Sequence, residues 1–309
     1  MKLKKNPLIK LFSELKILKE ENLLLFHSGT RDVEEIKVLM DEESECLILD
    51  QCVEDLNDYY SLNENYSKEE HFTLIKDKYV KTPPLEDDYI RYSFYNKFLK
   101  DSSILDFGCG KGGFLRLLKE NNISQNLKGL ELNKKNNENI NLGGIECFFD
   151  LKNTNEKFDL IFLNHVFEHL DDPVGILKDL ISRLNKDGKI IIEIPHGNDF
   201  LIKRADLKSF KDFTFWSEHL CLYTEKFITS LFEKINLEDY TIFYEQRYDL
   251  NNHINWFKES KPGGHNKKIF NGQILDDYNR NLIKNCETDT LMIVIGEKSK
   301  MFCDNLTII

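Results

Sequence analysis

Ser103-Ile104-Leu105-Asp106-Phe107-Gly108-Cys109-Gly110-Lys111-Gly112-Gly113-Phe114 is the stretch that decides the fold of this chain. A short apolar run ends in the carboxylate of Asp106 and then enters a cluster of glycines, after which leucines recur with helical spacing. This order predicts a strand, a tight turn and a helix. Glycines allow positive φ and close approach of a ligand, and the free N–H groups of a new helix point at the same place. The turn is therefore predicted to hold a nucleotide.

Two classes of nucleotide site share this glycine spacing. Gly108, Gly110 and Gly113 fit the dinucleotide pattern G-x-G-x-x-G, whereas Gly108, Gly110 and Gly112 fit the G-x-G-x-G of enzymes that use S-adenosylmethionine (SAM). Asp106 favours the second class, because a carboxylate at this place repels a pyrophosphate and attracts a cationic amino-acid end. A nucleotide-dependent oxidoreductase is the alternative from a different class.

With this motif the chain resembles the class I SAM-dependent methyltransferases. Three further segments resemble strands of that family in the family's order: 126–133 the second strand, 158–170 the fourth strand with its turn, and 186–195 the fifth. The resemblance implies an α/β fold, with a Rossmann-like seven-stranded sheet and helices on both faces. It also implies SAM as the cofactor and S-adenosylhomocysteine as its product.

The resemblance implies a set of cofactor-binding residues, most of which end a strand. Glu131 is expected to take the ribose hydroxyls, and Asp150 the exocyclic amine of adenine while Leu151 packs on the ring. Asn164 and His165 are expected beside the methionine portion. The full predicted set is Asp106, Phe107, Gly108, Cys109, Gly110, Gly112, Glu131, Leu132, Asp150, Leu151, Asn164 and His165.

Three histidines are candidates for the base that removes a proton from a hydroxyl acceptor, because imidazole titrates near neutral pH. His165 ends the fourth strand and His196 follows the fifth. His219 ranks first because it lies on a segment expected to cover the transferred methyl group. The order His165-x-x-Glu168-His169 is not the H-E-x-x-H of metalloproteases, so no metal is predicted.

The flanking segments predict a small N-terminal module and a C-terminal insertion. Helical periodicity extends over 7–25, and two apolar runs at 36–40 and 46–50 flank a polar connection of hairpin length. A polar, tyrosine-rich stretch at 53–85 is expected to form a lid or linker. The predicted organisation is a module at 1–95 and a methyltransferase domain at 96–300, with substrate-side segments at 196–224 and 246–288 and a tail at 301–309.

The insertion at 246–288 departs from the minimal fold, and long insertions are usually functional. It resembles that of bacterial methyltransferases associated with surface polysaccharides, which implies O-methylation of a sugar or another small glycan precursor. N- or C-methylation of a related precursor, including a phosphate-bearing or phosphoramidate one, and SAM binding without turnover remain alternatives. The residues predicted to bind the substrate are Arg91, Trp216, Tyr223, Arg247, His253, Lys261 and His265.

Composition limits the partners. The 309 residues carry a net charge of −11, which opposes nucleic-acid binding by counterion release and favours a small-molecule or nucleotide-linked sugar substrate. Seven cysteines without a C-x-x-C pair predict reduced thiols and a cytoplasmic location. Charges interrupt the apolar pattern near the N-terminus, so neither a signal peptide nor a membrane span is predicted.

Overall fold

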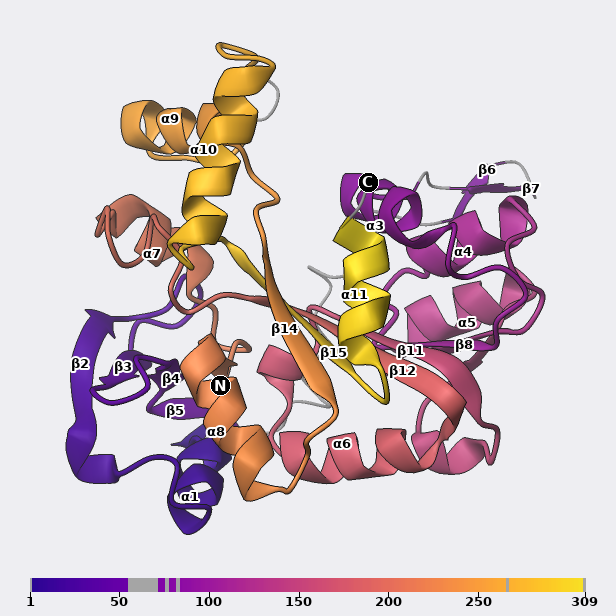
Figure 1. Ribbon diagram of the computed structural model, residues 1–309, viewed down its shortest axis with the longest axis horizontal. Coiled ribbons are helices and arrows are strands. Elements are labelled where there is room, and N and C mark those ends of the chain that lie inside the picture. The colour runs from indigo at the N-terminus through magenta and orange to yellow at the C-terminus, as the bar shows by residue number, and fades with distance from the viewer. Residues whose placement is uncertain (1, 55–71, 76–77, 82–83, 265–266, 308–309) are drawn as a thin grey trace.

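The computed structural model describes residues 2–54, 72–75, 78–81, 84–264 and 267–307 (Figure 1). No helix within these ranges is long and apolar enough to cross a membrane. Most of the segment predicted as a lid or linker, 53–85, lies outside the described residues, which include β6 (Phe72–Ile75) and β7 (Lys78–Lys81) from it.

A seven-stranded sheet forms the centre of the molecule, which confirms the predicted α/β fold. Its strand order is β10-β9-β8-β11-β12-β15-β14, and only β15 runs antiparallel to its neighbours. The strands are β8 (Ile104–Phe107), β9 (Leu127–Leu130), β10 (Glu146–Phe148), β11 (Phe158–Asn164), β12 (Leu184–Pro195), β14 (Tyr240–Glu245) and β15 (Thr290–Ile295). The parallel strands end at one edge, which is where such sheets bind ligands.

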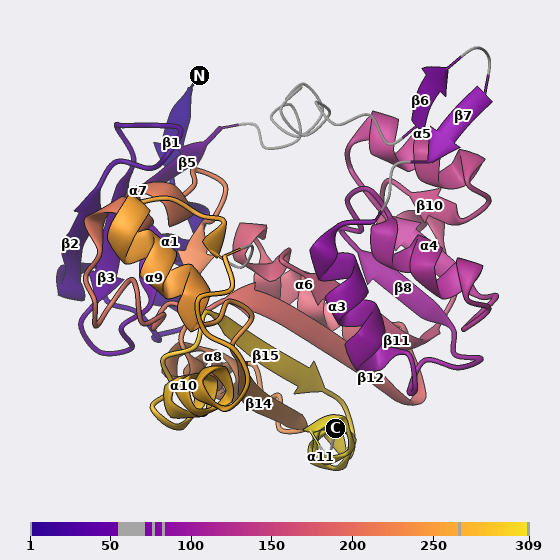
Figure 2. The ribbon, with the colours of Figure 1, turned by 90° about the horizontal axis from the view of Figure 1, so that it is seen from above.

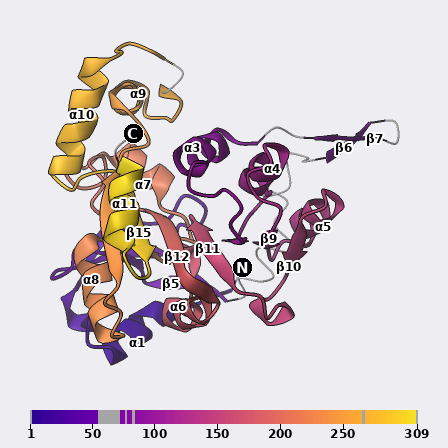
Figure 3. The same ribbon diagram turned by 45° about the vertical axis from the view of Figure 1, so that its right-hand side comes forward.

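Helices cover both faces of this sheet (Figure 3). One face packs on α1 (Pro7–Glu14), α6 (Pro173–Ser182) and α8 (Glu225–Lys234), and the other on α3 (Glu86–Tyr95), α4 (Gly113–Glu120), α5 (Lys134–Leu142) and α11 (Ser299–Thr307). Alternation along β12 sends Ile190, Ile192 and Ile194 into the first core and Ile191 into the second. Glu193 has the same phase as Ile191, so its carboxylate points to the α3 side.

The N-terminal module differs in part from the prediction. The predicted helix over 7–25 ends at Glu14, and Lys16 has a positive φ of 58° that turns the chain. The second half of that segment is η1 (Glu20–Asn22) and then β2 (Leu23–Ser28). The leucines at 23–25 belong to a strand because they pair with β3 (Lys37–Asp41). The predicted hairpin is confirmed, since β3 pairs antiparallel with β4 (Leu47–Leu49).

The module shares its sheet with the substrate-side segment 196–224. The strand β13 (Cys221–Leu222) pairs with β4, so the sheet order is β13-β4-β3-β2. Across this join, the Asn6 side chain donates to the Leu220 carbonyl at 3.0 Å, and the Thr224 hydroxyl donates to the Ser44 carbonyl at 2.7 Å. Strands β1 (Leu3–Lys5) and β5 (Gln51–Val53) pair beside it (Figure 2). The N-terminal module thus helps to position this distant segment.

The insertion and the C-terminus are helical. The insertion forms α9 (Leu250–Glu259) and α10 (Gln273–Lys284), and Trp256 of α9 packs on Phe210 and Phe213 of α7 (Lys208–Thr214), with ring centroids about 5 Å apart. The segment predicted as a tail at 301–309 instead lies largely in α11, where the Phe302 ring contacts Phe98. Its apolar residues explain this helix, because they cover the second core.

Candidate active site

A cavity of about 880 Å³ lies at the carboxyl ends of β8, β9 and β11. This volume falls within the range of pockets that hold a small ligand or cofactor. Most of the predicted cofactor set lines it: Phe107, Gly108, Gly110, Glu131, Leu132, Asp150, Leu151, Asn164 and His165. Asp106, Cys109 and Gly112 do not line the cavity. The edge of the sheet therefore gathers residues that are up to 58 positions apart in the chain.

The glycine turn shapes the floor of this cavity. Gly108 has φ +72°, and a Cβ there would lie 2.5 Å from Cγ2 of Val166, so only glycine fits. Gly110 has φ +52° and nothing within 4 Å of its Cβ position, which leaves the turn open. Cys109 points away, with its Sγ 3.9 Å from the Sγ of Cys147 on β10. The backbone, rather than side chains, faces a ligand at this turn.

Asp106 acts from beneath the cavity rather than on its surface. Its side chain is 3% exposed, and Asn164 Nδ2 donates to its Oδ1 at 3.3 Å. Burial raises the pKa of Asp106 to about 7, although the charge of Arg91 opposes this. Asn164 lines the cavity, and its Oδ1 is buried without a hydrogen-bond partner. The Asn164 amide thus binds the Asp106 carboxyl through Nδ2 and keeps a buried, unsatisfied acceptor in Oδ1.

Glu131 follows β9 and lines the cavity directly. Its carboxylate accepts the backbone N–H of Asn133 at 2.6 Å. Burial raises the pKa of Glu131 to about 7, while hydrogen bonds from the backbone of Asn133, Gly110 and Leu132 lower it. The side chain is therefore fixed by its own loop and by the glycine turn, and it offers an acceptor midway along the cavity.

The far end of the cavity is apolar on one side and polar on the other. Leu132 and Phe149 are both exposed large apolar side chains that line it. Asp150 follows β10 and accepts the backbone N–H of Lys152 at 2.9 Å, which begins the short helix η3 (Leu151–Asn153). Such a wall suits a flat aromatic ring with polar edges.

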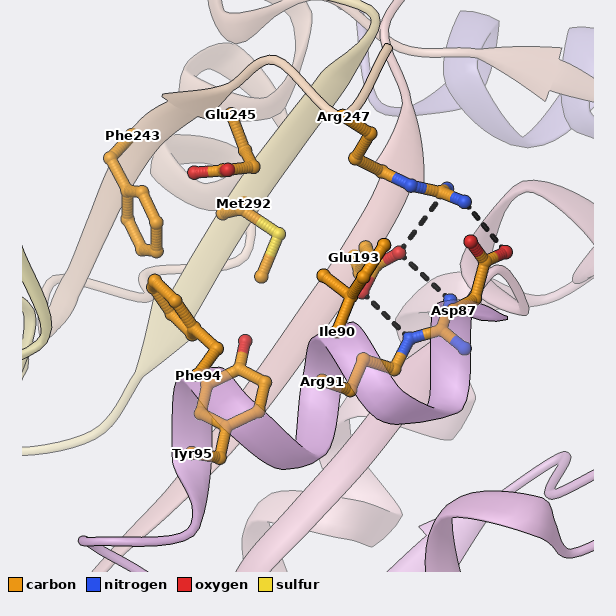
Figure 4. A pocket seen from close by; sticks show the side chains of 10 residues that line it. All are labelled: Asp87, Ile90, Arg91, Phe94, Tyr95, Glu193, Phe243, Glu245, Arg247 and Met292. Atoms are coloured by element: carbon orange, nitrogen blue, oxygen red, sulfur yellow. Dashed lines mark hydrogen bonds and ion pairs between the residues drawn. The ribbon is translucent and has the colours of Figure 1, made fainter. Parts of the chain in front are cut away.

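A network of buried charges borders the cavity on the α3 side (Figure 4). The Glu193 carboxylate accepts both guanidinium bonds of Arg91, at 2.9 and 2.8 Å. It also lies 3.0 Å from His165 Nε2 and 3.4 Å from Arg247 Nη1, and Arg247 in turn pairs with Asp87 at 2.6 Å. The two predicted substrate-binding arginines are therefore engaged by carboxylates of the protein itself. They line a small pocket beside the cavity rather than the cavity.

His165 joins the cavity to this network. Its φ of 53° lies in the left-handed region, and its two ring nitrogens face Glu168 (3.3 Å) and Glu193 (3.0 Å). Burial and the neighbouring Arg247 lower the pKa of His165, but the contacts with Glu168 and Glu193 outweigh them and raise it. The imidazole is thus held in a fixed orientation by two carboxylates, and the guanidinium of Arg247 also contacts its Nε2.

A second polar cluster is formed by Glu168, His169 and His219. Each offers one ligand atom, and these atoms lie within 4.8 Å of one another. His169 lines the cavity, whereas His219 packs edge-on against the His169 ring with centroids 5.0 Å apart. Burial, with a further contribution from His169, lowers the pKa of His219 to about 3. The first-ranked predicted base therefore lies behind another histidine.

The other predicted catalytic and substrate residues lie apart from the cavity. His196 is 2% exposed, contacts the Thr288 carbonyl through Nδ1, and has its pKa lowered by burial to about 4. Tyr223 is fully buried among Phe12, Phe167 and Phe227. His253 stacks on Phe200 and is hydrogen-bonded to the Tyr278 hydroxyl, Trp216 lies under Arg31, and Lys261 is exposed. His265 lies outside the described residues. Apolar packing explains why the aromatic segment at 213–223 turns inward.

Sequence reasoning missed two acids of the site, Glu193 and Glu168. Glu193 stands in the apolar strand sequence Ile190-Ile191-Ile192-Glu193-Ile194, and a single acid in such a run was a signal for a buried, paired carboxylate. Glu168 precedes His169 in the turn after β11 and is 0% exposed. His165 and His169 of the same turn lie beside it, whereas its third neighbour, His219, comes from a distant segment that the local motif did not reveal.

Residues 81–242, just over half of the chain, match the family model described as "Methyltransferase domain". The chain belongs to this family and is a methyltransferase by that assignment. The sheet order and the glycine turn described above agree with it.

Among curated proteins, the chain is similar to enzymes named tRNA U34 carboxymethyltransferase. It is 30% identical to the one from Campylobacter jejuni subsp. doylei over 176 residues, which cover 48% of this chain and 59% of that protein. It is 33% identical to the one from Sulfurimonas denitrificans over 119 residues, covering 34% and 39%. The chain thus spans between about two and three fifths of the length of these relatives.

A solved SAM-dependent methyltransferase from Archaeoglobus fulgidus is 22% identical, with a TM-score of 0.43, and covers 67% of this chain and 91% of that one.

Proposed function

We propose that this protein binds SAM in the 880 Å³ cavity and transfers its methyl group to a small polar acceptor. The observation that carries this proposal is the pairing of Asn164 with Asp106. Nδ2 of Asn164 donates to the acidic Asp106, and Oδ1 of the same amide is a buried acceptor without a partner. This combination suits the ammonium group of an amino-acid ligand, because a buried unsatisfied acceptor gains most from a charged donor.

The rest of the cavity fits the other parts of SAM in order. Glu131 supplies a carboxylate for the two ribose hydroxyls, and the wall of Leu132, Phe149 and Asp150 suits the adenine ring. A dinucleotide fits less well, because the acidic Asp106 lies beneath the turn where a pyrophosphate would lie. These features favour the SAM interpretation of the glycine spacing over the oxidoreductase alternative.

When bound, SAM supplies an activated methyl group on a sulfonium, so the protein has to align the acceptor and manage its proton. His165 and His169 line the cavity beside Asn164. His165 is held by Glu168 and Glu193 in a fixed orientation, which suits it to positioning an acceptor oxygen. His196 and His219, the other predicted bases, do not line the cavity.

The more specific part of the proposal is the identity of the molecule that accepts the methyl group. The sequence resemblance supports a sugar or glycan-precursor hydroxyl, whereas the comparisons supply no surface-polysaccharide relative. The curated relatives carry tRNA-modifying names, so a tRNA base is the second candidate and stands against the predicted absence of a nucleic-acid partner. The net charge of −11 favours the small acceptor, since the affinity of proteins for nucleic acid comes largely from phosphate neutralisation.

Two measurements test the proposal. In calorimetric titrations we expect SAM and S-adenosylhomocysteine to bind wild type and reduced nicotinamide dinucleotide not to bind. Asp106→Asn should weaken SAM binding about tenfold, whereas Asp150→Asn, a matched neutralisation at the adenine end, should cost less. Binding of the dinucleotide in place of SAM would overturn the cofactor assignment.

Acceptor class is then read by transfer of a radiolabelled methyl group from SAM to nucleotide-linked sugars or to total tRNA. Label in the sugar fraction supports the first candidate. Label confined to tRNA would replace it with the second.

A further inference from the structure

The geometry points to a binding site for one divalent transition-metal ion of the Zn²⁺ type, formed by Glu168, His169 and His219 at the inner end of the cavity. Each side chain contributes one ligand atom, and the three atoms lie within 4.8 Å of one another. Oε1 of Glu168 lies 3.7 Å from Nε2 of His169. One carboxylate and two imidazoles form a donor set that first-row transition metals prefer.

The carboxylate of Glu168 is the first independent observation that points to a ligand. Its side chain is 0% exposed, and neither oxygen has a hydrogen-bond partner of good geometry. Its close neighbour is Nδ1 of His165, at 3.3 Å. A buried carboxylate whose oxygens lack good hydrogen bonds is costly, and paired or metal-bound carboxylates are the usual exceptions. A cation between Glu168, His169 and His219 would satisfy it.

His219 supplies the second observation. Its Nδ1 is buried without a hydrogen-bond partner. A buried polar nitrogen without a partner is costly, and a metal ion held together with Glu168 and His169 would satisfy it.

His169 faces Glu168 through Nε2, and its Nδ1 lies 3.8 Å from Oε2 of the buried Glu218, which is longer than a hydrogen bond. Glu218 and His219 are consecutive, and the β13–β4 pairing of the adjoining Cys221 and Leu222 fixes their segment against the N-terminal module. The third ligand thus depends on the tertiary fold.

Three protein ligands leave a tetrahedral metal with one open position. His169 lines the cavity, so this position faces the proposed acceptor side. There a metal would lower the pKa of a bound hydroxyl. This use in catalysis rests on the proposed function, whereas metal binding itself does not. The inference departs from the expectation of no metal, which considered only the local motif at 165–169.

The site can be tested by titrating Co²⁺ into chelator-treated protein from which any affinity tag has been removed. We expect one equivalent to bind, with visible d–d absorption bands typical of low-coordinate cobalt, and Zn²⁺ to displace it. Glu168→Gln and His219→Gln should each weaken binding at least tenfold. His253→Gln is the matched control, because His253 is also a buried imidazole with a fixed partner, the hydroxyl of Tyr278.

Thermal unfolding separates loss of the site from loss of the fold. Zn²⁺ should raise the Tm of wild type and of His253→Gln but leave the Tm of His169→Gln unchanged. Absence of saturable Co²⁺ binding to wild type, or equal affinity in all variants, would overturn the inference. Because SAM binding is measured separately on the metal-free protein, failure of the metal site and failure of the proposed function give different results.

Discussion

The cofactor cavity and the charged pocket under α3 contain the same kind of residue, a buried carboxylate, in opposite electrostatic states. In the cavity, burial raises the pKa values of Asp106 and Glu131 to about 7, and neither makes an ion pair within the described part of the chain. In the charged pocket, burial acts in the same direction, but His165 and Arg91 hold the pKa of Glu193 well below its ordinary value. The first region leaves acids ready for a ligand, and the second satisfies its acid internally.

The largest effect is expected from breaking the charged pocket. Glu193→Ala leaves Arg91, Arg247 and His165 in the interior without their shared counter-charge. Removing one partner of a buried ion pair typically costs about 3–5 kcal/mol. Urea unfolding should show this loss in the free energy of unfolding. Glu245→Gln is the control, because Glu245 lines the same pocket but burial raises its pKa to about 7, so that neutralising it removes little. Equal stability of the two variants would show that the ion pairs of Glu193 do not stabilise the charged pocket.

Most of the cofactor cavity was predictable from the sequence because its residues end consecutive strands. Topology alone brings Gly108, Glu131 and Asn164 to one edge of a parallel sheet, whatever the details of packing. Asp106 shows the limit of this reasoning. Its position in the chain was right, yet the alternation of the strand places the carboxyl beneath the cavity, where it acts through Asn164.

The charged pocket and the histidine cluster were not predictable in the same way. Arg91 comes from a helix before the first strand of the sheet, Arg247 from the residues after β14, and His219 from a segment held by the N-terminal module. No periodicity in the sequence specifies which of these meet. Tyr223 and His253 were predicted to bind the substrate but are buried in the interior, because aromatic side chains that suit a substrate pack equally well in a core.

Asp199 is a buried acid that lies outside both the cofactor cavity and the charged pocket, so it shows what burial does to a carboxyl group. Burial, reinforced by the charge of Asp289, raises the pKa of Asp199 to about 8. The folded state therefore retains a proton between pH 4 and 8 that the unfolded state releases, so this group lowers stability as the pH rises through that range. We expect wild type to lose about 3–4 kcal/mol more between pH 5 and 8 than Asp199→Asn, which keeps an acceptor for the backbone N–H of Leu201.

Denaturant unfolding at several pH values measures this difference. Because Asn remains neutral, the variant should match wild type near pH 5 and exceed it in stability at pH 8. Parallel pH profiles for the two proteins would show that Asp199 is ionised in the fold. In that case, burial alone would not be enough to raise the pKa of an acid in this protein, and the raised pKa values of the cavity acids would need another cause.

Glu131→Gln addresses the cavity itself. The amide keeps the size of the side chain and an oxygen that can accept the N–H of Asn133, but it loses the charge that favours hydrogen bonds from hydroxyl groups. We expect SAM affinity to fall about tenfold, or about 1.4 kcal/mol, with little change in unfolding free energy. Glu146→Gln, an exposed acid on the adjacent β10, should bind SAM as wild type does. A stability loss in Glu131→Gln like that of Glu193→Ala would mean that Glu131, like Glu193, mainly stabilises the fold.

The smallest effect is expected where the N-terminal module meets the cavity. Lys4 of β1 and Glu54 after β5 both line it, so the module contributes to the wall opposite the glycine turn. A cation that water reaches is strongly screened, and such charges typically contribute less than about 1 kcal/mol. Lys4→Ala should therefore weaken SAM binding by less than about threefold, while Lys10→Ala on the exposed side of α1 should have no effect. A tenfold loss in Lys4→Ala alone would mean that the module closes on the ligand, and that the cavity, like the charged pocket, depends on contacts between distant segments.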